Sequence, residues 1–210
     1  MFTPPRYRLD DPQAAFDLID DHGFCVLVTV TDPAPAISHL PMIADRARNI
    51  LRGHLARANP HTALLDGRRH IAIFTGANAY VSPNWYRDRS RVPTWNYLTV
   101  HVEGVGRVID APEDVDALLA ALSAHYESRR HDLAADEAWT MDKLPPEKLA
   151  RLRRGIVAFE IAIDSVAAKA KLSQSDDEAD RAGAIEALSS GDDMRRAIAK
   201  AMLSATRKSG

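Results

Sequence analysis

The chain has 210 residues, of which 46% are hydrophobic and 27% charged, and its formal net charge is −2. These values are typical of one globular domain with room for an appendage, and the charge gives no electrostatic argument for binding nucleic acid or an anionic membrane. The first residues lack an apolar signal core, and no apolar run reaches membrane-spanning length. The single cysteine, Cys25, lies in an apolar run, so we expect a buried, inert thiol and a reducing, cytoplasmic compartment.

The first part of the chain predicts one helix followed by a meander of short strands. The run Asp10-Asp11-Pro12 is typical of a helix start, apolar residues then recur at helical spacing, and Gly23 ends the segment. Segments rich in β-branched residues and bounded by turns predict strands at 24–31, 36–43 and 50–55. Short strands joined by short turns favour antiparallel pairing.

The rest of the chain combines further strands with helices. Strands are predicted at 70–74, 79–81, 97–109 and 156–163, and helices at 61–65, 112–125, 145–154, 179–188 and 194–203. Gly104 and Gly106 indicate a bulge or bend in the long strand. Six or seven short strands with few helices between them favour a mainly β fold with flanking helices, in which the sheet forms a closed or partly closed barrel.

Two aromatic runs punctuated by proline, 82–86 and 92–97, do not fit ordinary core strands. They contain Trp85, Trp95 and two tyrosines, whose polar tips need partners when buried. Their prolines interrupt a sheet ladder. Such runs suit a wall that stacks on a flat ligand or closes an interface, and an aromatic loop covering the core is the alternative.

A basic cluster at 52–61 is the second candidate for a site. It combines Arg52, His54 and Arg57 with Asn59-Pro60, a typical helix start. Free backbone N–H groups and arginine side chains favour an anion such as a phosphate monoester. A solvated basic strand end is the alternative.

A third cluster, Lys169 to Gln174, follows the last predicted strand and offers two lysines, a serine and a glutamine to a phosphate or a polar ring edge. A charged connector is the alternative. No two histidines have the i, i+4 spacing of a zinc-binding helix, and no serine lies in a glycine-flanked elbow. We therefore expect no metal site, assign no catalytic residue, and expect any chemistry to come from a bound cofactor.

Several runs follow one another in a fixed order along the chain. They are 39–41, 52–60, 79–86, 92–97 with His101 and Gly104 beyond, 171–174 and 180–183. In this order they resemble the PaiB-like family, the FMN-binding negative transcriptional regulators, over nearly the whole chain. Ser175 departs from the pattern, since the family usually has Asn there, and the acidic run 176–178 follows it.

The resemblance implies a split β-barrel of the pyridoxamine-phosphate-oxidase-like type, which forms a homodimer and holds FMN in a groove between subunits. The composition shift from Lys169 onward predicts a barrel domain at 1–168 and a helical extension at 169–210, packed on the barrel or on the dimer partner. With FMN as the ligand that the resemblance implies, the chemistry and positions of the three clusters predict a phosphate cradle, a flavin wall and a closing segment. The predicted FMN-binding residues are Arg52, His54, Ala56, Arg57, Asn59, Thr94, Trp95, Asn96, Tyr97, Lys171, Ser173 and Gln174.

Three functions stay open at this point. The first is an FMN-binding protein, with or without flavin-dependent oxidoreductase activity. The second is a regulator that acts without redox chemistry, although no helix-turn-helix with a basic recognition face is evident and direct DNA binding stays undecided. The third is a haem-binding or haem-degrading split barrel.

Overall fold

The computed structural model describes residues 1–132, 134 and 137–207. The chain folds into two compact units built from segments that are not continuous in sequence. The barrel unit comprises His22–Phe74 and Val102–Val166. The ribbon unit comprises Met1–Asp21, Thr75–His101 and Ala167–Gly210. Each unit is described by itself.

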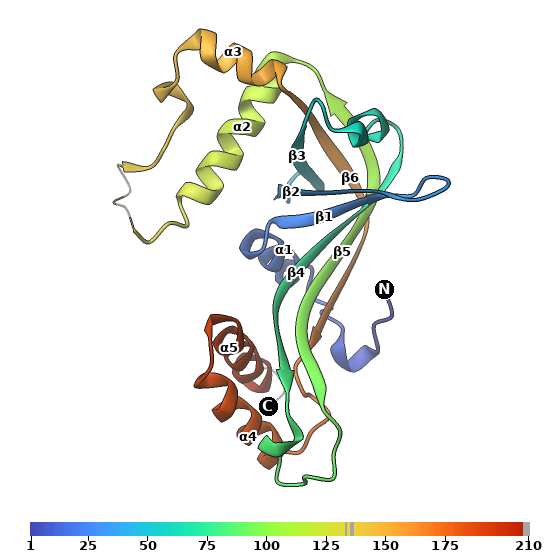
Figure 1. Cartoon of the computed structure of the whole chain (residues 1–210), viewed down its shortest axis with the longest axis vertical. Coiled ribbons are helices and arrows are strands. Elements are labelled where there is room, and N and C mark those ends of the chain that lie inside the picture. The colour runs from blue at the N-terminus through green and yellow to red at the C-terminus, as the bar shows by residue number, and fades with distance from the viewer. Residues whose placement is uncertain (133, 135–136, 208–210) are drawn as a thin grey trace. The chain divides into compact units, whose positions relative to one another are not determined.

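Six strands close into a barrel in the order β1-β2-β3-β6-β5-β4 (Figure 1). They are β1 (Phe24–Thr29), β2 (Ala36–Asp45), β3 (Ile50–Ala56), β4 (Arg69–Val81), β5 (Thr94–Ile109) and β6 (Ile156–Lys171). The first three form the antiparallel meander that their short turns favour. Strand β3 also pairs with β6 in antiparallel register, which places Arg52 opposite Glu160.

The helices are short and flank the strands. The α-helices are α1 (Pro12–Asp21), α2 (Pro112–Glu127), α3 (Pro146–Arg154), α4 (Glu178–Ser189) and α5 (Asp193–Arg207). Single 3-10 turns are η1 (Pro5–Tyr7), η2 (Pro60–Leu64), η3 (Pro83–Trp85) and η5 (Met141–Lys143). None of the described helices is long and apolar enough to cross a membrane.

The core of the barrel unit comes from strand residues that alternate inward. Side chains from five strands are at most 2% exposed: Cys25, Leu27, Leu40, Met42, Leu51, Phe74, Phe159 and Ile161. This alternation of period two turns the intervening residues outward. On the outside, α2 buries Leu118 and Leu122 against Ile43 of β2 and Ala158 of β6. Arg52 and His54 of β3 are the neighbours of Ile43 and Ala158 across the sheet, so they lie on the same outer face as α2.

The ribbon unit has its own core. The final residues of β4 and β6 are small or aliphatic, and they pack on α4 and α5, which lie against each other (Figure 1). Ala77, Ala79 and Ala170 form the strand side, and Leu188, Ile198 and Met202 form the helix side. Small strand residues let the two helices approach the sheet closely.

The predicted fold class, mainly β with flanking helices and a helical C-terminal part, is confirmed. The strands predicted at 70–74 and 79–81 are one strand, β4, and β6 runs to Lys171 rather than ending at 163. The inert Cys25 is also confirmed, because its thiol is buried and burial raises its pKa to about 12. The division at 168/169 falls inside β6 and stays a prediction.

Candidate functional site

Strand β3 carries two polar side chains, each with a buried nitrogen that has no hydrogen-bond partner among the described residues. Leu51 and Leu55 point into the barrel, so Arg52 and His54 lie on the opposite face. Arg52 Nε and His54 Nδ1 are both buried, and within the described part of the chain neither forms a hydrogen bond. Burial lowers the pKa of His54, which favours the neutral ring. Buried polar groups are nearly always paired, so these two atoms on one strand face are open to a water molecule or a ligand.

A cluster of arginines surrounds the residue opposite Arg52 on β6, Glu160, which is 7% exposed. Its carboxylate accepts hydrogen bonds from Arg107 Nη2 (2.6 Å) and Arg48 Nη2 (3.2 Å). Two arginines from other elements thus engage Glu160, the residue opposite Arg52. Guanidinium donors fit a phosphate group.

Sequence reasoning missed three members of this cluster, Arg48, Arg107 and Glu160. The signal that could have found them is the single carboxylate inside the apolar run 156–163. A lone acidic residue in a buried strand needs a cationic partner, since burying an unpaired charge is costly.

Asn59, predicted for the phosphate cradle, is engaged inside the barrel unit. Its side-chain oxygen accepts the backbone N–H of His61 (3.0 Å), which caps η2, and its Nδ2 donates to Ser38 Oγ (3.1 Å). The His61 ring is 3% exposed, and its Nδ1 lies 2.9 Å from Ser38 Oγ, so the ring is the next member of the hydrogen-bond chain. Asn59 therefore holds the turn and starts a buried hydrogen-bond chain.

The direction of this chain follows from its far end. His70 Nε2 lies 3.2 Å from the carbonyl oxygen of Leu65, which can only accept, so Nε2 carries the ring proton. His70 Nδ1 then accepts from Thr29 Oγ1 at 2.6 Å, and Thr29 accepts in turn from His61 Nε2 at 2.8 Å. His61 Nδ1 is left to accept from Ser38. Both rings are neutral, in agreement with burial, which lowers the pKa of each.

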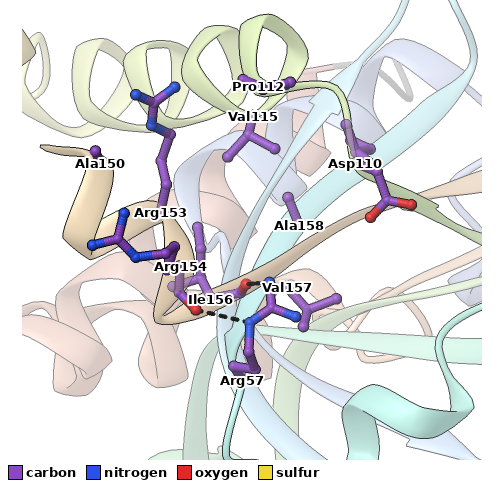
Figure 2. Close-up of a pocket in the computed structure, with 11 residues that line it drawn as sticks. Arg57, Asp110, Pro112, Val115, Ala150, Arg153, Arg154, Ile156, Val157 and Ala158 are labelled. Carbon is purple, nitrogen blue, oxygen red and sulfur yellow. Dashed lines mark hydrogen bonds between the residues drawn. The ribbon is translucent and has the colours of Figure 1, made fainter.

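Arg57, also predicted for the cradle, holds the end of α3. Its Nε donates to the carbonyl of Arg154 (2.8 Å) and its Nη2 to that of Ile156 (2.6 Å), as the dashed lines in Figure 2 show. A cation at a helix C-terminus satisfies free carbonyls and complements the helix dipole. Arg57 lines a cavity beside α2 and α3 that neither Arg52 nor His54 lines. Ala56 is exposed at the end of β3.

Four predicted residues come together in the ribbon unit. Thr94 and Asn96 from β5 and Lys171 and Ser173 from the end of β6 line a cavity of about 190 Å³. Lys171 Nζ donates to Thr94 Oγ1, and the fully buried Asn96 donates from Nδ2 to Ser173 Oγ (3.0 Å). Tyr7, Tyr86, Arg91, Val92, Ser175 and Asp176 complete the walls. The cavity is polar and offers both donors and acceptors.

The other predicted residues of this unit lie elsewhere. Trp95 and Tyr97 alternate with Thr94 and Asn96 along β5, and neither lines the cavity. Trp95 is 53% exposed and meets Tyr80 edge to face at 6.1 Å. Tyr97 lies under Lys169 Nζ at 5.1 Å.

The Gln174 side chain forms hydrogen bonds with the neighbouring backbone. Its Oε1 accepts from the backbone N–H of Leu172 (2.7 Å) and its Nε2 donates to the carbonyl of Ala170 (2.6 Å). The side chain therefore fixes the turn after β6, where Ser173 has a positive φ of 60°. This turn presents Ser173 to the cavity.

The aromatic run 82–86 is fastened by α4. Asp180, fully buried, accepts the backbone N–H of Arg87 (2.6 Å) and a hydrogen bond from Arg91 Nη1 (3.0 Å). Burial alone would raise the pKa of Asp180, but these hydrogen bonds outweigh it and the pKa is lowered. Gly183 lies so close to this segment that an added Cβ would be 2.2 Å from the carbonyl oxygen of Trp85. The 180–183 run therefore serves close packing.

Comparison with known proteins agrees with this fold. Residues 1–165 match a family model described as "Putative FMN-binding domain". The chain is 30% identical over 191 residues to "Protease synthase and sporulation protein PAI 2" of Bacillus subtilis, covering 90% of this chain and 89% of that protein. It is 31% identical over 102 residues to "Uncharacterized protein YKL070W" of Saccharomyces cerevisiae, covering 44% of this chain and 60% of that protein.

Solved structures share the fold at low identity. An FAD- and haem-binding protein from Mycobacterium smegmatis matches with a TM-score of 0.62 and 19% identity, over 85% of this chain and 80% of that one. A flavocytochrome from Azotobacter vinelandii matches with a TM-score of 0.58 and 13% identity, over 84% of this chain and 75% of that one. The predicted split barrel, family and cofactor are confirmed. This chain belongs to the PaiB-like family of FMN-binding split-barrel proteins.

Proposed function

We propose that the chain is a flavin-dependent oxidoreductase in which Arg52 and His54 bind the phosphate of FMN. The observation that carries the assignment is the pair of buried polar atoms, Arg52 Nε and His54 Nδ1, on one face of β3. A phosphate oxygen accepts from the Arg52 guanidinium, and the neutral His54 donates where its Nδ1 carries the proton. Arg48 and Arg107 keep Glu160 occupied, so Arg52 stays available for an anion.

The ribbon unit has a polar cavity of its own. Asn96 and Ser173 offer amide and hydroxyl groups there, and Lys171 adds a cation. Bound FMN supplies hydride or electron transfer, while the protein orients it and excludes water. Trp95, more than half exposed on the other face of β5, is available to a flat ring or to a second subunit.

Titration of the protein with FMN, followed by flavin fluorescence, tests the phosphate site. Arg52→Gln removes a charge-assisted hydrogen bond, and we expect about 30-fold weaker FMN binding. Arg68→Gln, a matched change of an exposed arginine in the same unit, is expected to bind FMN as the wild type does. Unchanged affinity in Arg52→Gln would overturn the assignment. A Soret band in the purified protein, in place of flavin absorption, would favour the haem alternative.

We propose further that the protein acts as a homodimer in the cytoplasm. In the barrel unit Val30, Ile37 and Phe24 are more than half exposed, which is costly in water unless a second copy covers them. We expect Ile37→Arg to shift the protein to a monomer in light scattering coupled to size exclusion. A wild-type monomer would contradict the proposal. The buried Cys25, the single cysteine, is compatible with a reducing compartment.

For the regulatory role that the family name implies, we propose an indirect action through the flavin state or a partner protein. The net charge of −2 supports this, since a direct DNA reader carries a basic face. A gel-shift titration at low and physiological salt decides the point. Saturable binding to one DNA sequence would overturn the indirect route.

A further inference from the structure

A second cavity, in the barrel unit, is lined by neither Arg52 nor His54. It has a volume of about 420 Å³ and lies between the start of α2, the end of α3 and the start of β6 (Figure 2). This volume is within the range of about 300–1,000 Å³ found for small-molecule sites. Its lining joins three arginines and one aspartate to seven apolar residues.

Two of the arginines are held rigidly. Arg57 is fixed by hydrogen bonds to the carbonyls of Arg154 and Ile156, and its Nη1 group donates to no described residue. Arg153 Nη1 donates to Asp116 Oδ2 at 3.2 Å, so its charge is balanced. The Arg57 guanidinium is therefore positioned by two hydrogen bonds and still has free N–H donors. This positioning lowers the entropic cost of binding an anion.

The third arginine, Arg154, is the last residue of α3 and is exposed at the cavity. Within the described chain its guanidinium forms no hydrogen bond or ion pair. The one carboxylate in the lining is Asp110, at the end of β5. Two unneutralised guanidinium groups against one carboxylate favour a ligand with a single negative charge.

The remaining lining residues are apolar and favour contact with a hydrocarbon group. Val115 of α2, Ile109 of β5 and Ile156 and Ala158 of β6 are among the lining residues and belong to one apolar cluster. Val115 and Ile109 are both buried, so this part of the cavity offers little to a fully polar ion. A ligand that matches both the arginines and the apolar lining residues has an apolar body and one anionic group.

We propose that this cavity binds a small organic acid, with its carboxylate on Arg154 and Arg57 and its apolar body against Val115 and Ile156. The proposal is independent of the FMN phosphate site on β3. It assigns Arg57 to this second ligand and to the end of α3.

Calorimetry on the full chain as purified, with its flavin, tests the proposal with three eight-carbon probes. Octanoate has the predicted charge and body, 1-octanol lacks the charge, and octylamine reverses it. We expect octanoate to bind with a dissociation constant on the order of 1 mM, given the usual affinity per ligand atom. We expect 1-octanol to bind about tenfold more weakly and octylamine to show no saturation. Equal binding of all three probes, or none by octanoate, would overturn the proposal.

Two variants locate the binding. Arg154→Gln removes the free charge and is expected to weaken octanoate binding about tenfold without affecting 1-octanol. Ala150→Leu fills the cavity from a partly exposed position on α3 and is expected to weaken both probes. Arg151→Gln, on the same helix but outside the lining, is the matched control. Melting curves verify that each variant is folded.

A competition with FMN separates this site from the flavin site. We expect added FMN to leave octanoate binding unchanged, and Arg52→Gln to bind octanoate as the wild type does. Stoichiometric displacement of octanoate by FMN would show that the cavity belongs to the flavin site and would overturn the proposal. Failure of the FMN phosphate assignment alone leaves the octanoate result as it stands.

Discussion

One buried hydrogen-bond network of the barrel unit is neutral, whereas one buried network of the ribbon unit carries full charges. Thr29, His61 and His70 form a chain of hydrogen bonds in which each hydroxyl and ring donates once in one direction. In the ribbon unit Asp180 is fully buried and pairs with Arg91, which also reaches Asp176 at 2.6 Å. The first network fastens η2 to β1 through neutral hydrogen bonds. The second fastens the segment after η3 to α4 through charged groups.

The difference decides what each network tolerates. A neutral chain has one proton arrangement that works, because a carbonyl at one end fixes every donor along it. A charged cluster has several donors on one carboxylate, so the loss of one leaves others in place. We therefore expect the barrel network to be the more sensitive to small changes in composition and to mild acid.

The largest expected effect is that of Thr29→Val, which keeps the side-chain shape and removes the central hydroxyl of the neutral chain. His61 Nε2 and His70 Nδ1 both lose a buried partner, so we expect a loss of about 3 kcal/mol in the free energy of unfolding. Urea denaturation measures it. The control, Thr31→Val, removes a hydroxyl that bonds only the carbonyl of Ala34 in a turn and is expected to cost under about 1 kcal/mol. Equal costs would mean that the chain is not a connected network.

Gly183→Ala tests the packing of the ribbon unit. Alanine in a helix is ordinarily better than glycine by about 1 kcal/mol. Here its Cβ would meet the carbonyl oxygen of Trp85 at 2.2 Å, so α4 must shift, and we expect a net loss of about 2 kcal/mol. Ala182→Ser, at an exposed position of the same helix, should stay within about 0.5 kcal/mol of the wild type. A stabilised Gly183→Ala protein would contradict the close approach.

The two networks are expected to lose their contribution to stability in different pH ranges. Burial lowers the pKa of His61 and His70 in the folded state, so below about pH 6.5 the unfolded chain takes up protons first. The stability that these rings contribute is complete above this pH and falls as the pH drops, by up to about 1.4 kcal/mol per pH unit for each ring.

Asp180 responds in a lower window, because its pKa is lowered and its contribution is lost only below about pH 4. Hydrogen exchange measured from pH 7 to pH 4 should therefore show β1 and β4 of the barrel unit losing protection before α4. The reverse order would contradict the assignment of neutral rings.

Much of the fold follows from local pattern, and its errors have a physical cause. Runs rich in β-branched residues and bounded by turns placed β1 to β3 within two residues of their observed ends. The segment around Gly76 and Asn78 reads as a break between strands, because such residues have low strand propensity. It is nevertheless continuous in β4, where Ala77 and Ala79 pack under α4 and α5, a tertiary contact that no local pattern reveals.

The candidate site was less predictable, since residues of one motif turned out to have different partners. Arg52 and His54 have open polar atoms, whereas Asn59, a few residues later, is satisfied by Ser38 and His61. Those partners lie on other elements and are invisible in the linear motif. The alternation that separates Asn96 from Trp95 was readable from the sequence, because successive strand residues face opposite sides.

The smallest expected effect comes from the charged network. Tyr86 Oη donates to Asp176 Oδ2 over a long 3.4 Å, and Arg91 lies over the Tyr86 ring at 5.2 Å. Tyr86→Phe removes the weak hydrogen bond and keeps the ring under the cation, so we expect a loss of about 0.5 kcal/mol in urea denaturation. Tyr80→Phe, at a position 43% exposed, is the control for loss of a phenol alone. Because Asp176 keeps its pairing with Arg91 in the variant, a cost as large as that of Thr29→Val would mean that the charged network is as inflexible as the neutral one.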